Sequence, residues 1–112
     1  MSLAFDARIH DVTVPTGQNA SRWIFGTYEY SDATAITIQS PAGLDAGTWT
    51  IEVSNDGTTA SALNDGTSDI PVPAAGKARQ YIEMIGFKFF RIKCSVNVAE
   101  TRTFLVSKQW TV

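Results

Sequence analysis

The chain has 112 residues, of which 44% are hydrophobic and 18% charged. These values fit one globular domain that can bury a core without metals or disulfides, and they exclude a disordered or fibrous protein. The formal net charge of −2 does not indicate nucleic-acid binding, and we expect no direct contact with nucleic acid.

The chain begins with short runs in which apolar and polar residues alternate. Residues 5–9 alternate, and then the phase slips so that Val12 and Val14 fall on the opposite parity. A slip of this kind is typical of a bulge or bend in an edge strand. A loop follows, so we predict an N-terminal arm or edge strand over residues 1–20 and a β-sandwich domain over residues 21–112, forming one domain overall.

The next segments continue the pattern of short strands. Residues 34–39 alternate with Ile36 and Ile38 on one face, and the sequence PAGLDAG at 41–47 then breaks the chain. The clearest strand spans residues 48–54. Its apolar positions predict a core-facing side and its polar positions a water-facing side. The core-facing residues are Trp49, Ile51 and Val53, and the water-facing residues are Thr50, Glu52 and Ser54.

Two Asp-Gly turns follow this strand. The strand ends at Asn55-Asp56-Gly57, and a second Asp-Gly pair, Asp65-Gly66, follows nine residues later. Asn and Asp tolerate the turn and Gly supplies a positive φ, so the first turn indicates a hairpin. Residues 60–63 form a weak second strand, and two prolines confine residues 70–73 to an edge or an extended connector.

The last third of the chain contains one ambiguous segment. Residues 77–85 fit both a helix and a strand, and the strand is favoured because so short a helix is marginal. In residues 87–94, Phe90, Ile92 and Cys94 share one face. In residues 103–112, Lys108 interrupts an apolar face and is expected to extend its amine towards solvent.

Together these segments give eight or nine short strands at roughly ten-residue spacing. This spacing predicts an all-β fold: a single antiparallel β-sandwich or jelly-roll-like domain. There is no βαβ pattern, which excludes a parallel nucleotide-binding sheet.

The residues that carry chemistry are few. His10 is the single histidine, and nothing near it in sequence suggests a nucleophile for it to activate. Cys94, the single cysteine, shares a face with Phe90 and Ile92 and is expected to be a buried, inert thiol. One cysteine and one histidine cannot fill the four ligand positions of a zinc site. Asn55, Asp56 and Asp65 could contribute oxygens to calcium, but turn chemistry explains them without a metal. We therefore expect no catalytic residues, no cofactor, no metal and no enzyme activity.

The aromatic residues Trp23, Tyr28 and Tyr30 lie close together in sequence. Such residues serve sugar stacking or protein interfaces when they are exposed, and ordinary core packing when they are not. The candidate interface or glycan contacts are Phe5, Trp23, Tyr28, Tyr30, Leu44, Asn55, Asp56 and Asp65. They fall largely in three expected contact regions, residues 1–20, 41–47 and 55–69.

Residues 36–106 resemble a family of small tailed-bacteriophage virion proteins. The matching segments are WTIEVSNDG at 49–57, VPAAG at 72–76, FRIKCS at 90–95 and RTFLV at 102–106. The resemblance implies a capsid decoration, cement or head-fibre component. Related patterns carry an aromatic shortly after the S-x-D-G turn, where this chain has Thr59-Ala60, so sugar stacking by that loop is not expected.

The resemblance implies a non-catalytic capsid decoration or cement protein that binds the major capsid protein and its own copies, as a dimer or trimer. It would stabilise the shell from the virion's capsid surface after assembly in the host cytoplasm. The alternatives are a carbohydrate-binding module of a tail or fibre and a head–tail or tail joining component.

Two further features bear on location and partners. Residues 1–11 lack a signal-peptide pattern, and no apolar run approaches the roughly 18 residues of a membrane helix, so we expect no membrane contact. Charge is uneven: residues 1–50 carry two basic and five acidic side chains, residues 51–76 none and four, and residues 77–112 seven and two. Such uneven charge could allow the protein to dock on a charged partner. Alternatively, strands from the acidic and basic segments lie next to one another in the fold, and the charges average out.

Overall fold

The computed structural model describes residues 5–25, 33–82 and 87–111. Eight strands and no helix occur in these ranges, so the all-β prediction is confirmed. The strands are β1 (Phe5–Val14), β2 (Ile24–Phe25), β3 (Ala33–Gln39), β4 (Trp49–Ser54), β5 (Ser61–Ala62), β6 (Ala78–Tyr81), β7 (Phe89–Cys94) and β8 (Arg102–Thr111). The strand predicted within residues 77–85 is present as β6, and residues 83–85 lie outside the described ranges.

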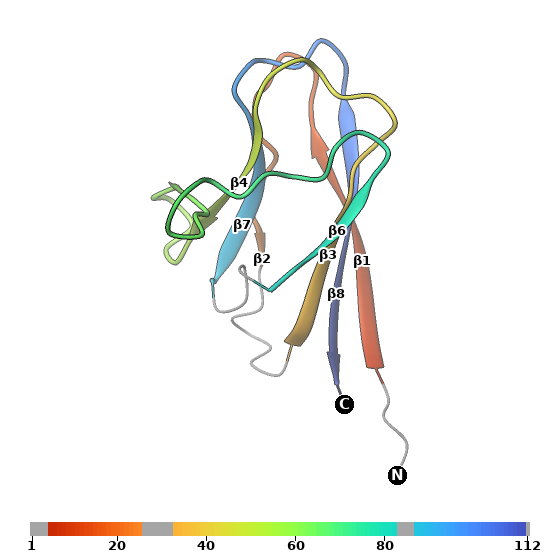
Figure 1. Cartoon of the computed structure of the whole chain (residues 1–112), viewed down its shortest axis with the longest axis vertical. Coiled ribbons are helices and arrows are strands. Elements are labelled where there is room, and N and C mark those ends of the chain that lie inside the picture. The colour runs from red at the N-terminus through yellow and green to blue at the C-terminus, as the bar shows by residue number, and fades with distance from the viewer. Residues whose placement is uncertain (1–4, 26–32, 83–86, 112) are drawn as a thin grey trace.

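The strands form two antiparallel sheets, ordered β1-β8-β3-β6 and β2-β7-β4-β5 (Figure 1). β4 pairs with β5, β3 with β6, β2 with β7 and β1 with β8. The chain therefore folds back on itself about the β4–β5 connection. The pairs are nested: the farther a strand lies before this connection in sequence, the farther after it lies its partner.

The apolar faces of both sheets meet in one core. Trp49 of β4 and Phe104 of β8 belong to different sheets, and their ring centroids lie 5.4 Å apart. The predicted inward residues of β4 and β7 are confirmed, since all are buried. The core strands contribute Val12, Val14, Ile36, Ile38, Trp49, Ile51, Val53, Phe90, Ile92, Cys94, Phe104 and Val106. Burying each large side chain stabilises the fold by about 1.5–3 kcal/mol before entropy is counted.

β1 is an edge strand, but the bulge predicted for it is absent. It pairs with β8 without a shift from Phe5 opposite Thr111 to Val14 opposite Arg102. The shift in this sheet lies instead between Ala33 and Ala35, where β3 pairs with β8. The change in alternation between residues 5–9 and Val12 is therefore not caused by an extra residue in the β1–β8 pairing.

Two predictions about polar side chains were wrong. Ser54 was expected to face water, but it is buried because its hydroxyl organises the turn that follows β4. Lys108 was expected to reach solvent, but only 4% of its surface is exposed. Its place between the inward positions of β8 puts it in the core layer, and a side chain centred in a sheet has no short route to water.

The fold also brings two basic side chains of the last third against acidic residues from earlier in the chain. Arg91, from the basic last third, donates from Nε to Glu52 Oε1 at 2.7 Å. Arg102 donates from Nε to Asp45 Oδ1 at the same distance. These pairs join the basic segment to both acidic segments, as interleaving of the segments predicts.

Candidate functional site

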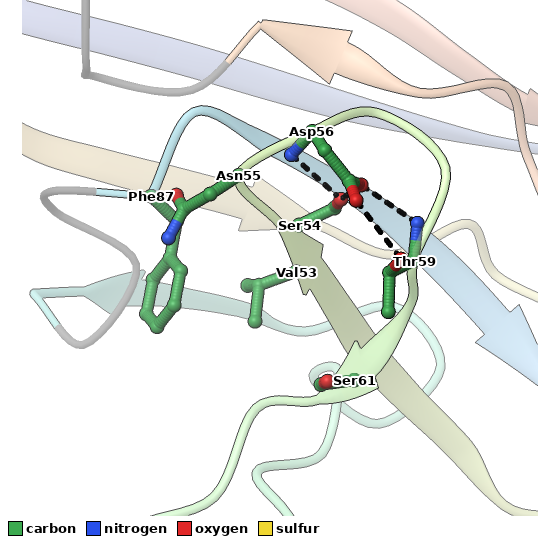
Figure 2. A pocket seen from close by; sticks show the side chains of 7 residues that line it. All are labelled: Val53, Ser54, Asn55, Asp56, Thr59, Ser61 and Phe87. Carbon is green, nitrogen blue, oxygen red and sulfur yellow. Dashed lines mark hydrogen bonds between the residues drawn. The ribbon is translucent and has the colours of Figure 1, made fainter.

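A shallow hollow of about 360 Å³ lies where β4 ends (Figure 2). It is formed by the end of β4, the loop that follows, the start of β5 and one residue that precedes β7. Its lining residues are Val53, Ser54, Asn55, Asp56, Thr59, Ser61 and Phe87.

Asp56 builds the loop that forms one wall of this hollow. Its Oδ1 accepts hydrogen bonds from the backbone N–H groups of Thr58 (2.8 Å) and Thr59 (2.7 Å) and from the hydroxyl of Ser54 (2.8 Å). Its Oδ2 accepts one from the hydroxyl of Thr59 at 2.9 Å. The backbone N–H of Thr58, followed by that of Thr59, lowers the pKa of the Asp56 carboxyl far below its usual range.

This arrangement makes the loop sensitive to acid. Because the folded-state pKa of Asp56 is depressed, its stabilisation is present above the ordinary value of 3.8 and is lost as the pH falls towards the folded-state pKa. We expect Asp56→Asn to lower stability at neutral pH and to flatten the loss of stability below about pH 4. Urea unfolding at a series of pH values measures this, and an equally steep acid profile in the variant would contradict it.

Both Asp-Gly turns contain glycine in the left-handed region, with φ of 76° at Gly57 and 100° at Gly66. Asp65 accepts from the backbone N–H groups of Ser68 and Thr67, and these bonds lower its pKa too. The turns predicted for Asp56 and Asp65 are thus confirmed, and they explain both carboxylates by local hydrogen bonding.

The two glycines differ in their surroundings, which gives a matched test. A methyl group at Gly57 would meet the Phe89 ring at 3.3 Å, whereas one at Gly66 has open space around it. We expect Gly66→Ala to cost about 1–2 kcal/mol, the backbone penalty alone. Gly57→Ala should cost measurably more, since the ring must also move. Thermal unfolding of the two variants checks this, and equal losses would show that the ring contact is unimportant.

Phe87 is the functional candidate that the sequence analysis missed. In β4–β7 pairing, Ser54 lies opposite Phe89, so the residues just before β7 lie beside the loop just after β4. The backbone N–H of Lys88 also donates to Asn55 Oδ1 at 3.1 Å. The Phe87 ring therefore lies beside the S-x-D-G loop although it is more than thirty residues away in sequence. Only a prediction that β4 pairs with β7 could have located this ring from the sequence.

Leu44 lies in a second hollow, of about 400 Å³, between its own loop and residues 71–74. Asp45 fixes this loop: its carboxylate accepts from the Ala99 backbone N–H (2.9 Å) and from Arg102, and its carbonyl accepts from Trp49 Nε1 (3.0 Å). The Ala99 N–H is the main cause that lowers the pKa of Asp45, followed by Arg102. This loop is held to β8 and to β4.

Trp23 immediately precedes β2 and lines neither hollow. The Arg91 guanidinium lies 4.4 Å from the centroid of the Trp23 ring and covers one face of that ring. Tyr28 and Tyr30 fall outside the described residues. Phe5 begins β1, and its side chain is likewise not described. The grouping of Trp23 with Tyr28 and Tyr30 therefore stays a prediction.

The remaining chemical inventory is short. Cys94 is fully buried, as expected for a packing thiol. Within the described ranges, no three His, Cys, Asp or Glu side chains gather as metal ligands. No helix suited to crossing a bilayer is found in these ranges either.

No family model matches the chain, and no curated protein matches it. Among solved structures, it is similar to a chain described under "Bacillus endospore appendages form a novel family of disulfide-linked pili". That match has 20% identity, 99% coverage of this chain, 89% of the other and a TM-score of 0.54. At this identity the likeness shows a shared fold alone.

Two weaker matches are a mitogen from Yersinia pseudotuberculosis and the capsid of cyanophage Pam1. The mitogen match has 13% identity, coverages of 92% and 84% and a TM-score of 0.48. The capsid match has 14% identity, coverages of 96% and 84% and a TM-score of 0.42. These TM-scores are too low to establish a common fold.

Proposed function

We propose that the protein is a non-catalytic structural protein of a bacteriophage virion. In this proposal it is a decoration or cement protein that binds the major capsid protein and its own copies, and so stabilises the shell from its outer surface. Each contact is modest, but repetition over a closed shell supplies avidity.

The proposed fold is a jelly-roll β-sandwich. Its support is the pairing order, with eight antiparallel strands in two four-stranded sheets folded about the β4–β5 connection. Sandwiches of this kind are rigid and need no cofactor to fold, which suits a part that is used in many copies.

The observation that carries the assembly role is the open edge of β1. Among the described residues, β1 pairs with β8 along all ten of its residues and with no other strand. The other three outer strands, β2, β5 and β6, have two to four residues. A long edge without a bulge or an internal proline is the kind of surface that natural proteins block unless it is used. This edge lies within residues 1–20, which we propose as a contact region.

The similar pilus-associated chain is described as part of a disulfide-linked assembly. This chain has one cysteine, and Cys94 is completely buried. Contacts between its copies would therefore be non-covalent, made by backbone edges and surface side chains.

Co-sedimentation with capsids that lack the protein tests the proposal. We expect saturable binding of the purified protein at a fixed ratio to the major capsid protein, with a raised temperature of shell disruption. Absence of binding to such capsids would overturn the proposal. Rings of fixed symmetry in negative stain would contradict a decoration role and support the joining component instead.

A further inference from the structure

The hollow after β4 combines an aromatic ring with polar groups whose bonding capacity is unused. Phe87 is partly buried and packs against the core from one side. Figure 2 shows its ring beneath the side chain of Asn55, on the opposite side of Val53 from Ser61 and Thr59. The ring is therefore held in place while it still lines the hollow.

Asn55 presents two hydrogen-bond donors. Its Oδ1 accepts from the backbone N–H of Lys88, and only an oxygen can do so, which fixes the orientation of the amide. The Nδ2 group then has no partner among the described residues. It is a positioned donor pair at the rim of an aromatic ring.

The opposite wall adds a hydroxyl and an acceptor. Ser61 is exposed, and its hydroxyl has no partner in the described part of the chain. Asp56 Oδ1 already takes three donors, whereas Oδ2 takes one and keeps a second lone pair. The hollow thus offers donors, an acceptor and a hydroxyl that can act as either.

This set selects a class of ligand by its chemistry. Among the described lining residues only Asp56 is charged, so none of them is a cation that would bind an anion. Four hydrogen bonds from the loop already occupy most of the Asp56 carboxylate, which leaves one acceptor position on Oδ2 for a neutral ligand. A pyranose ring has an apolar C–H face that packs on an aromatic ring and neighbouring hydroxyls that both donate and accept. The volume of about 360 Å³ is at the small end of ligand sites.

We propose that this hollow binds one residue of a neutral pyranose sugar, with its C–H face against Phe87 and its hydroxyls bonded to Asn55 Nδ2, Ser61 and Asp56 Oδ2. The proposal is independent of capsid binding: a sugar site would add recognition of a glycan surface to a structural part. It also differs in place from a site on Trp23.

A neutral glycan array, followed by calorimetric titration with the best saccharide, tests the proposal on the full chain. Three variants each change one lining residue: Phe87→Leu removes the ring but stays apolar, Ser61→Ala removes the hydroxyl, and Asn55→Asp keeps an oxygen for Lys88 but replaces the donors by an acceptor and adds a negative charge. We expect Phe87→Leu and Asn55→Asp each to weaken binding about tenfold or more, and Ser61→Ala to weaken it severalfold.

The controls are Trp23→Ala, at a half-buried aromatic that does not line the hollow, and Thr13→Ala, on the outer face of the first sheet. Both should bind the saccharide within about twofold of the unaltered protein. Circular dichroism confirms that each variant is folded. No binding on the array would overturn the proposal, as would binding that Trp23→Ala abolishes and Phe87→Leu leaves intact.

Discussion

Replacing Phe104 by alanine is expected to lower the free energy of unfolding by about 3–5 kcal/mol. Phe104 is fully buried, and its ring lies 5.4 Å from that of Trp49 in the facing sheet. The substitution removes an aromatic contact and leaves a cavity between two sheets that strand pairing holds in place. A domain of this size has a total stability of about 5–15 kcal/mol, so the loss is a large share. Urea unfolding followed by tryptophan fluorescence measures it.

The neighbouring residue provides the control for this prediction. Leu105 follows Phe104 on β8, points to the opposite face and is 43% exposed. Leu105→Ala should change stability by no more than about 0.5 kcal/mol. Similar losses for the two variants would be incompatible with a core that lies between the sheets on the Phe104 side of β8.

Removing the hydroxyl of Ser21 is expected to cost about 1–3 kcal/mol. Ile24 pairs with Phe90 while Ala20 bridges to Lys93, so one strand holds one residue more than the other between these pairs. Ser21 lies in this irregular stretch. Its Oγ accepts from the buried backbone N–H of Ile92 at 3.0 Å, in place of a carbonyl. Ser21→Ala would leave that N–H buried and unpaired.

Two variants separate the lost hydrogen bond from other effects. Ser21→Thr keeps the hydroxyl and should recover most of the lost stability. Thr13→Ala removes an exposed hydroxyl that contacts Thr103 Oγ1 at 3.2 Å, and solvent can replace this bond. Equal destabilisation by Ser21→Ala and Thr13→Ala in chemical denaturation would show that the irregular pairing does not depend on Ser21.

Part of the candidate site could be predicted from residues close together in sequence, and part depends on residues far apart in sequence. Asn55, Asp56 and Asp65 were predicted to be turn residues, and each carboxylate accepts from backbone N–H groups two and three residues ahead. Asx turns of this kind are visible in any sequence because both partners lie within four residues. Phe87 joins the hollow only because β7 lies beside β4.

The sequence by itself determined the strands and the inward residues of the clearest ones. A period of two and Asp-Gly turns are local properties, so Trp49, Ile51 and Val53 could be predicted directly. The strand at 78–81 was favoured over a helix only because so short a helix is marginal. It also limited the chemistry, since one histidine and one cysteine cannot supply the four ligands of a zinc site.

Only the tertiary structure decided which strands are neighbours. Pairing of β1 with β8 joins residues about a hundred positions apart, and no local pattern encodes that choice. Pairing of β4 with β7 placed Arg91 against Glu52 and brought Phe87 to the loop of Asn55, and the packing of the sheets buried Lys108 and Ser54. Each of these depends on the free energy of packing two whole sheets together, which alternation within a single strand cannot reveal.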